Sequence, residues 1–475
     1  MSERHQTRLI EAFNATSPRV AARPVPAAST LLFFGVIGLW IFVFLGGFVF
    51  SGLLAWSAGL LYVFYDTALL LNVTRRTWFV HQQPMRAPTV PPVTGPRPTL
   101  GVIVAARNEQ NVLAGTINAL FAQTDPPDEI IIADDGSIDR SAEVLANVFG
   151  VTPPPLGEIS APVAAYPGLR LLRLPHGGKA RALNQAIERA TTDIFLTVDA
   201  DTILEPEALA AMRRAFAEDP QLVAACGVLT PVCSGSWTAG FFQWFQTYEY
   251  VRAFVSRVAW ARAGALLLVS GAFAGFRRAA VLTVGGFDPD CLVEDYELIH
   301  RLRRYGYQHG LNWHSMALGS ARATTAAPDR PLRFLRQRRR WFGGFLQTQF
   351  WYREMVGNRQ YHRLGTWMLP VKAADTLQPI YGLFAFALLL FYIVTGKAAV
   401  LIPVGGFIIG KIILDLAFHA WSIRLYRNWT GGHTKVSFGF ALLAAIVEPF
   451  SFQLLRHLGA SWGWLRFITG KRGWS

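Results

Sequence analysis

Cysteine and charged side chains are scarce in this sequence. Three cysteines occur among its 475 residues, and charged residues make up 16% of the chain. Cys226, Cys233 and Cys291 lack the paired spacing of a cysteine-based metal site and cannot all be joined in disulfides, so we interpret them as reduced core thiols in a cytosolic region. Because so few residues are charged, the composition excludes an ordinary soluble protein of this length.

Acidic residues are fewer than basic ones. The chain has 31 Asp and Glu against 45 Lys and Arg, which gives a net charge of +14, and 52% of its residues are hydrophobic. A basic chain suits nucleic acid, anionic lipid or phosphorylated substrates. Since the chain is so apolar, we expect membrane lipids and a phosphorylated substrate as partners, and no nucleic acid.

The first 80 residues contain a long stretch with almost no charge. Residues 1–30 are polar and are expected to form a loosely ordered tail, whereas residues 31–73 contain Asp66 as their only charged side chain. A membrane-spanning helix needs about 20 apolar residues. We therefore expect residues 1–80 to be a tail and a two-helix hairpin with its turn within residues 46–52. Arginines flank both ends of the hairpin, which predicts that both ends are cytosolic.

A second apolar region lies at the C-terminal end. We expect residues 351–475 to contain about three spans and a basic tail, with the spans at 376–396, 398–423 and 436–456. Arg466 and the basic tail follow the last span, against the positive-inside rule. The last stretch is therefore interfacial or re-entrant, or the number of spans differs.

Three of the charged residues inside the expected spans are Asp66, Lys411 and Asp415. Asp66 is costly in lipid, so it faces protein or water, or it lies near the interface. Lys411 and Asp415 lie four residues apart and pair on one helix face. They either line a water-filled path or form a structural ion pair.

Between the two membrane regions, residues 99–350 have the pattern of an α/β domain, preceded by a proline-rich linker at 81–98. Apolar runs of strand length alternate with helix-like segments: 99–105 with 109–122, 129–133 with 139–149, 169–174 with 179–190, and 193–198 with 206–218. This alternation predicts a mostly parallel sheet with helices on both faces. Ligands bind such sheets at the carboxyl ends of the strands.

Polar clusters follow three of these strands: Arg107-Asn108-Glu109, Asp134-Asp135-Gly136-Ser137 and Asp199-Ala200-Asp201. Each alone suits a turn or a helix cap. Residues two apart in an extended segment point the same way, so Asp199 and Asp201 project together. Two such carboxylates suit Mg²⁺ or Mn²⁺ holding a diphosphate. Three clusters at one edge of one sheet favour a binding site.

Further motifs carry open alternatives. The segment from His176 to Lys179 precedes a helix and suits phosphate or a plain glycine turn. Glu294 and Asp295 open another helix, where acidic residues also stabilise the dipole. Residues 335–341 contain four arginines and Trp341, which suit a diphosphate or anionic lipid. The aromatic helix expected at 237–262 lies in the membrane interface or contributes a core stripe.

The ordered motifs resemble those of the membrane-integrated inverting glycosyltransferases of family 2, which have a Rossmann-like GT-A fold and include cellulose, hyaluronan, chitin and poly-N-acetylglucosamine synthases. The resemblance covers residues 99–350 closely and the membrane spans loosely. Its elements, in family order, are Ala106-Arg107-Asn108-Glu109, Asp134-Asp135-Gly136-Ser137, Gly178-Lys179-Ala180-Arg181-Ala182-Leu183-Asn184, Asp199-Ala200-Asp201, Glu294-Asp295 and Gln337-Arg338-Arg339-Arg340-Trp341.

The resemblance implies roles for these residues. Asp295 would be the general base, and Asp199 and Asp201 would hold Mg²⁺ or Mn²⁺, Asp201 more directly. Trp341 would stack on the acceptor sugar, and Phe273 would help to line the acceptor site. The implied substrate-binding residues are Glu109 and Asp134 or Asp135 for the uridine, Lys179 and Arg340 near the diphosphate, and also Asp199, Phe273, Glu294, Gln337 and Trp341.

The resemblance predicts a processive enzyme of a bacterial-type inner membrane, with a cytosolic GT-A domain between transmembrane segments. It would transfer a sugar from a UDP-sugar to a growing β-glycan with inversion and export the product through its own helices. N-acetylglucosamine or glucose is the expected sugar. One alternative is a non-processive enzyme that adds one sugar to a lipid. Another is a nucleotide-sugar sensor or transporter, which would not need a base at Asp295.

Overall fold

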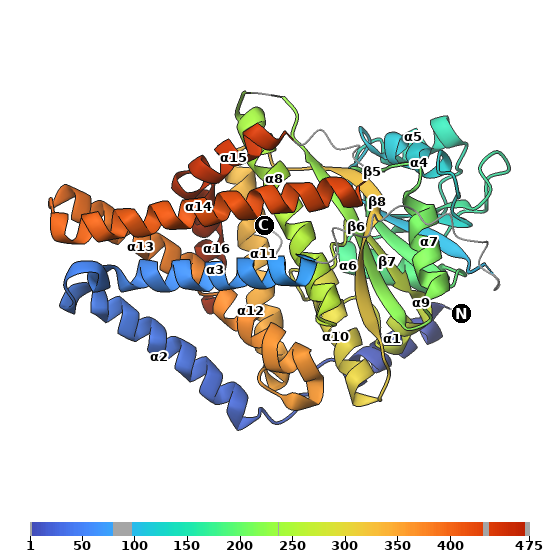
Figure 1. The fold of residues 1–475 in the computed structure, drawn as a ribbon. Helices are drawn as coiled ribbons and strands as arrows, with labels where there is room; N and C mark the ends of the chain where they lie inside the picture. Colours follow the sequence, from blue (N-terminus) through green and yellow to red (C-terminus); the bar gives the residue numbers. More distant parts are fainter. Residues whose placement is uncertain (1, 79–96, 236, 431–436, 471–475) are drawn as a thin grey trace.

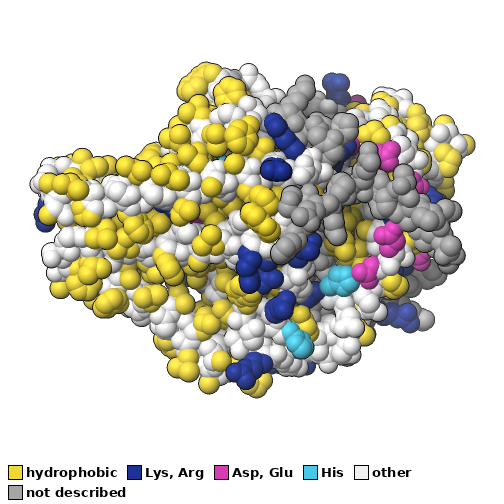
Figure 2. Space-filling model, in the orientation of Figure 1, with side chains coloured by type: hydrophobic (Ala, Val, Ile, Leu, Met, Phe, Trp, Pro, Cys, Tyr) yellow, Lys and Arg dark blue, Asp and Glu magenta, His cyan; other side chains and the backbone are white. Residues whose placement is uncertain are grey.

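The computed structural model describes residues 2–78, 97–235, 237–430 and 437–470, and most of the predicted linker 81–98 and the tail after residue 470 lie outside this range. An α/β domain lies at one end of the molecule, and long helices extend from it on the other side (Figure 1). Hydrophobic side chains cover most of the helical end, while Lys and Arg gather where it meets the α/β domain (Figure 2).

The α/β domain is built on one eight-stranded sheet with the order β3-β2-β1-β4-β7-β6-β8-β5. The first four strands in this order are mutually parallel, as predicted, and the remaining strands make the sheet mixed. The strands are β1 (Leu100–Ala106), β2 (Glu129–Asp135), β3 (Leu169–Leu174), β4 (Ile194–Asp199), β5 (Thr202–Leu204), β6 (Leu222–Val232), β7 (Phe273–Arg277) and β8 (His314–Ala326).

Helices cover both faces of this sheet. Along β1, Val102 and Val104 belong to one core cluster and Ile103 to the other, because successive side chains of a strand point to opposite faces. One face packs against α4 (Leu113–Phe121), α5 (Ser141–Phe149) and α7 (Ala208–Glu218), and the other against α6 (Lys179–Arg189), α9 (Arg278–Thr283) and α10 (Glu294–Gln308). The sheet is therefore buried on both sides, as the sequence predicts.

The N-terminal tail is more ordered than expected. Residues Ser2–Thr16 form α1, which packs beside α6 and α9. Leu9 and Phe13 are buried, and the guanidinium of Arg301 lies 4.5 Å from the centre of the Phe13 ring. The expectation of a loosely ordered tail is wrong for this helix because its apolar face is buried against the domain.

Three described segments are long and apolar enough to cross a membrane: Ala27–Val49, Gly52–Thr77 and Ala398–Trp429. The first is α2, the second comprises η1 (Gly52–Trp56) and α3 (Ser57–Thr77), and the third is α14. The turn of the N-terminal hairpin lies at residues 50–52, within the predicted region, and Gly52 has a φ of 60° that suits glycine. A fourth segment is bent by 41° between α12 (Leu369–Asp375) and α13 (Gln378–Val394).

The last apolar segment is not the straight span expected at 436–456. It consists of α15 (Phe438–Val447), η6 (Glu448–Phe450) and α16 (Phe452–Ile468), and it bends by 49° at the break. Beyond the bend, α16 runs alongside α11 (Pro331–Trp351) and crosses the direction of α3 and α14 (Figure 1). This path agrees with the interfacial or re-entrant alternative for the last stretch.

Two helices join the domain to the membrane helices. The expected aromatic helix is α8 (Trp237–Arg262), which packs on β6 and β8 and also against α3, α14 and α15. The other is α11, which carries the arginine cluster and contacts both α10 and α16. The arginine motif is therefore between the sheet domain and the apolar helices.

Candidate active site

The strand register brings the acidic clusters to one edge of the sheet. Ala105 of β1 pairs with Asp199 of β4, and the next residue, Ala106, pairs with Asp134 of β2. The loops after these strands interlock, because the Asn108 side chain accepts a hydrogen bond from the Ile138 backbone at 2.9 Å. The clusters that the sequence places at strand ends therefore lie side by side.

Glu109, Asp199 and Asp201 form a group of neighbouring carboxylates. Burial and the charge of Asp199 raise the pKa of Asp201, and burial together with Asp201 and Asp199 raises the pKa of Glu109. Thr325 donates a hydrogen bond to Asp201 at 3.4 Å, while Thr202 donates to Thr325 at 2.8 Å. A bound cation would relieve the repulsion among the carboxylates of Glu109, Asp199 and Asp201.

The group fits a divalent cation that also binds a diphosphate. The described residues contain no group of three or more His, Cys, Asp and Glu side chains that could hold a metal ion on their own. Mg²⁺ is commonly held by one or two carboxylates, with the phosphates of a substrate completing its shell. The half-buried Asp199 and Asp201 meet this requirement, in accord with the raised pKa of Asp201.

Lys179 connects the carboxylates of two elements. Its ammonium donates a hydrogen bond to Asp199 and lies 3.9 Å from Oε1 of Glu294 at the start of α10. Burial lowers the pKa of Lys179, but Asp199 and Glu294 outweigh burial and raise the pKa overall. Lys179 is therefore a cation at neutral pH, between the end of β4 and the start of α10.

Asp135 holds the loop that precedes Lys179. Its carboxylate accepts hydrogen bonds from the backbone N–H of Gly177 at 2.7 Å and of Gly178 at 3.0 Å, and contacts His176 Nδ1 at 2.9 Å. The N–H groups of Gly177 and Gly178 are therefore used within the loop, which agrees with the plain glycine turn, one of the two alternatives for this segment. Asp135 is buried, and its contacts position Lys179.

Asp134 also has an internal contact. Its Oδ1 accepts a hydrogen bond from the Ser137 backbone at 2.9 Å, which is the turn contact expected of an Asp at this position. Both Asp134 and Asp135 are at most 7% exposed. Contacts of these residues and Glu109 with uridine remain predictions.

Asp295 is held in place at the start of α10. Its Oδ2 accepts a hydrogen bond from the Gly271 backbone at 2.6 Å, and its Oδ1 accepts one from Tyr296 at 2.8 Å. A Cβ atom at position 271 would lie 3.1 Å from Oδ2, so glycine permits this close approach. The adjoining Ala272 accepts a hydrogen bond from Asp199 N at 3.2 Å, which places Asp295 at the same edge of the sheet.

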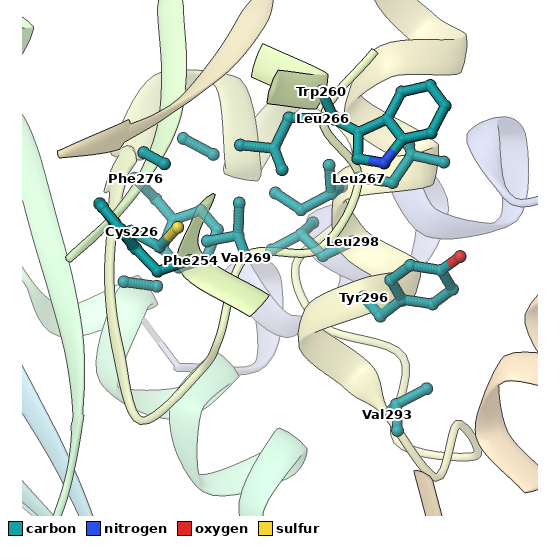
Figure 3. Packing of buried hydrophobic residues seen from close by; sticks show 14 of the residues in the cluster. Cys226, Phe254, Trp260, Leu266, Leu267, Val269, Phe276, Val293, Tyr296 and Leu298 are labelled. Carbon is teal, nitrogen blue, oxygen red and sulfur yellow. The ribbon is translucent and has the colours of Figure 1, made fainter. Parts of the chain in front are cut away.

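The segment before Gly271 is anchored by apolar packing. Leu266, Leu267 and Val269 are buried beside Leu298 of α10 (Figure 3). Glu294, beside Asp295, is 4% exposed, and burial raises its pKa while Lys179 and Arg340 oppose the shift. The two adjacent acidic residues thus differ in exposure: Glu294 is buried, whereas Asp295 is half-buried.

The arginine motif reaches the start of α10. Arg340 donates a hydrogen bond to the Leu292 carbonyl at 3.1 Å, and its charge acts on Glu294. Gln337 has a buried Oε1 with no hydrogen-bond partner among the described residues. The structure therefore brings Lys179, Asp199, Asp201, Glu294, Asp295 and Arg340 to one region. Trp341 follows Arg340 on α11 and is half-buried.

The expectation for Phe273 is corrected. Its side chain is 0% exposed and belongs to the core cluster on the face of α4, α5 and α7. In β7 this residue pairs with Val198, which belongs to the same cluster, so the register turns its ring into the core. Sequence reasoning also missed Gly271, which no charged or periodic pattern distinguishes.

Comparison with known protein families identifies the domain. Residues 101–285 match the family described as Glycosyl transferase family 2, and residues 194–402 match Glycosyl transferase family group 2. The chain carries a family 2 glycosyltransferase domain. The predicted resemblance and the α/β fold are thus confirmed.

Relatives of this glycosyltransferase domain include poly-beta-1,6-N-acetyl-D-glucosamine synthases. The Staphylococcus aureus (strain MSSA476) protein is 30% identical over 207 residues, which are 43% of this chain and 46% of the relative. The Staphylococcus epidermidis protein is 26% identical over 254 residues, or 53% and 54% of the two chains. The chain thus spans about half the length of the curated relatives that it matches.

A solved structure supports the GT-A fold of the glycosyltransferase. The mannosyltransferase PcManGT from Pyrobaculum calidifontis, solved in complex with GDP-Man and Mn²⁺, superposes with a TM-score of 0.54. The match covers 83% of this chain and 98% of that chain at 22% sequence identity. At this level of identity the likeness concerns the fold.

Proposed function

We propose that the protein is a UDP-sugar-dependent inverting glycosyltransferase that extends a β-linked polysaccharide at the cytosolic side of a bacterial inner membrane. The observation that carries this proposal is the cluster of Asp295, Lys179 and the Asp199–Asp201 pair at one sheet edge. The names of the staphylococcal relatives support N-acetylglucosamine as the sugar.

In the proposed reaction, an acceptor hydroxyl attacks the anomeric carbon from the face opposite the nucleoside diphosphate. Asp295 takes the hydroxyl proton while the new C–O bond forms, and the bond from the anomeric carbon to the diphosphate oxygen breaks. The configuration at the anomeric carbon is inverted. The hydrogen bonds from Gly271 and Tyr296 keep the Asp295 carboxylate in one orientation.

The leaving diphosphate gains negative charge, which the cations of this chain would neutralise. Lys179 lies 3.9 Å from Glu294, the charge of Arg340 also acts on Glu294, and both cations suit this task. Asp199 and Asp201 would hold Mg²⁺ or Mn²⁺, which supplies further charge neutralisation when bound. Glu109 and the β2 end would hold the uridine, and Gln337 and Trp341 would face the acceptor.

Export is the second half of the proposal. A cavity of about 420 Å³ lies among α3, α8, α13, α14 and α16. Its lining combines apolar side chains with four acidic residues, Asp66, Glu249, Asp415 and Glu448, and three basic residues, Arg252, Lys411 and Arg456. Each of these charged side chains takes part in an ion pair, as charges inside a membrane protein usually do. A lining of paired charges suits a neutral, hydroxyl-rich chain.

The test uses the purified full chain in detergent with labelled UDP-N-acetylglucosamine or UDP-glucose and Mn²⁺ or Mg²⁺. We expect UDP release and a polymer, resolved by size. Asp295→Asn should retain UDP binding yet lower turnover by about 10²- to 10⁴-fold, since a general base acts in the transition state. The matched variant Asp290→Asn, at a side chain 52% exposed, should react normally.

Three outcomes would contradict the proposal. A product with one added sugar would support the lipid-transferase alternative and exclude polymer synthesis. Near-normal turnover of Asp295→Asn would remove Asp295 from the role of base. UDP-sugar binding without any UDP release would instead favour a sensor or transporter.

A further inference from the structure

A chain of buried and half-buried charges runs from the cavity between the apolar helices to the arginine motif. Glu249 of α8 accepts a hydrogen bond from Arg338 at 2.7 Å and lies 3.7 Å from Arg456 of α16. Arg456 lies 3.8 Å from Glu448, which accepts a hydrogen bond from Arg252 at 2.5 Å. All of these residues except Arg338 line the cavity, so Glu249 is the carboxylate that joins the cavity to α11.

Arg338 contacts the aromatic residue that ends the motif. Its guanidinium lies 4.4 Å from the centre of the Trp341 ring and 4.6 Å from that of Phe334, and the residue is 5% exposed. A flat guanidinium can stack on a ring while its edge binds a carboxylate, which the ammonium of Lys cannot do. The hydrogen bond to Glu249 thus holds the Arg338 guanidinium in place, and that guanidinium packs against one face of the Trp341 ring.

From these contacts we infer that Arg338 is a positioning residue for the acceptor, acting through Trp341 and fixed by Glu249. This inference rests on the proposed function, in which Trp341 meets the acceptor sugar. Because Glu249 also lines the cavity and neighbours Arg456, the orientation of Trp341 depends on the charge network of the cavity. The acceptor site and the cavity are therefore coupled through one carboxylate.

The experiment measures KM for a β-1,6-linked N-acetylglucosamine tetramer, KM for UDP-N-acetylglucosamine, kcat and product length. Arg338→Gln should raise the acceptor KM by about tenfold, the usual effect of losing a charge-assisted hydrogen bond, and shorten the product. The donor KM should not change. Glu249→Gln should also raise the acceptor KM. The double variant should raise this KM no further than Arg338→Gln does, because both changes remove the same hydrogen bond between Arg338 and Glu249.

Two further variants separate positioning from folding. Arg338→Lys keeps the charge beside Glu249 but loses the flat stacking surface, so it should fold normally and still show the raised acceptor KM. Arg333→Gln, on the same helix at a side chain 68% exposed, should behave as the wild type.

The inference is overturned if Arg338→Lys and Arg338→Gln leave the acceptor KM unchanged, or if both KM values rise together as a general structural defect would make them. A wild-type enzyme that adds a single sugar would contradict the proposed polymer synthesis. The comparison of acceptor KM values would still decide the role of Arg338, so the two failures are distinguishable.

Discussion

Asp201 is the residue whose surroundings most clearly favour a cation. Burial and the charge of Asp199 disfavour its ionised form, and Thr325 provides one hydrogen bond. Lys179 already contacts Asp199, which offsets one of the negative charges. Glu109 repels Asp201, and in the part of the chain that the structure describes no cation forms an ion pair with Asp201, although the charge of Lys179 acts on it.

We predict that Mn²⁺ binding weakens as the pH is lowered. This weakening should begin at a higher pH than it does at a site whose aspartates have ordinary pKa values. A carboxyl group must lose its proton before it binds a cation. Since the pKa of Asp201 and of Glu109 is raised, protons compete with Mn²⁺ above the ordinary Asp value of about 3.9. Electron paramagnetic resonance of free Mn²⁺, titrated from neutral to mildly acidic pH, gives the apparent Kd.

Glu109→Gln provides the comparison for this titration. Removing the charge of Glu109 lowers the pKa of Asp201, so the loss of Mn²⁺ should begin at lower pH. The exposed Glu218→Gln of α7 should leave the profile unchanged. An identical onset in Glu109→Gln and the wild type would show that Glu109 does not act on the cation site.

The site could be predicted from the sequence only where local patterns report on it. Asp134 and Asp199 end parallel strands, and parallel strands align their carboxyl ends, so their convergence followed from the strand pattern. The contact of Asp295 with Gly271 joins residues 24 positions apart, and no local pattern indicates it. Phe273 was assigned wrongly because its side-chain direction depends on the register of β7 in the sheet.

At the scale of elements, the packing of α11 on α16 sets the position of the arginine motif. Gly459 and Gly463 lie one turn apart on α16, and small residues let two helices approach closely. A Cβ atom at Gly463 would lie 2.9 Å from the Arg339 carbonyl and from the Gly343 nitrogen. The approach is therefore between backbones, directly beside Arg340.

We predict that Gly463→Ala destabilises the protein by about 1–3 kcal/mol, because the added methyl group forces the two backbones apart. It should also lower transferase activity, since α11 carries Arg340. Gly410→Ala is the matched control on α14, where no atom lies within 4 Å of the new Cβ. Thermal unfolding in detergent measures both changes, and equal midpoints for the two variants would refute the close packing.

The elements differ in how well the sequence predicts them. The apolar runs within β1, β2 and β4 are continuous because these parallel strands are buried on both faces. β8 alternates buried and half-buried residues, and its partner β6 lies far away in the sequence, so neither was predicted. The bend before α16 follows Glu448 and Pro449. Because the segment is otherwise apolar, hydropathy alone predicts a single span there.

At the scale of the whole molecule, ion pairs connect the long apolar helices to one another, just as Lys179 connects elements at the candidate active site. Lys411 of α14 lies 2.8 Å from Asp66 of α3 and also binds Asp415 on its own helix. The pairing predicted for Lys411 and Asp415 is thus confirmed, and Asp66 faces protein. These contacts agree with the structural ion pair, and all three residues also line the cavity, where a water-lined path stays a prediction.

We predict that Lys411→Met lowers the free energy of unfolding by up to about 3 kcal/mol, because it leaves two half-buried carboxylates without their cation. The triple variant Asp66→Asn, Lys411→Met, Asp415→Asn leaves no unpaired charge and should recover most of this loss. Lys397→Met, at the exposed start of α14, should have little effect. Thermal unfolding in detergent reports the order of stability. A triple variant less stable than Lys411→Met would mean that the charges, rather than their balance, hold α3 against α14.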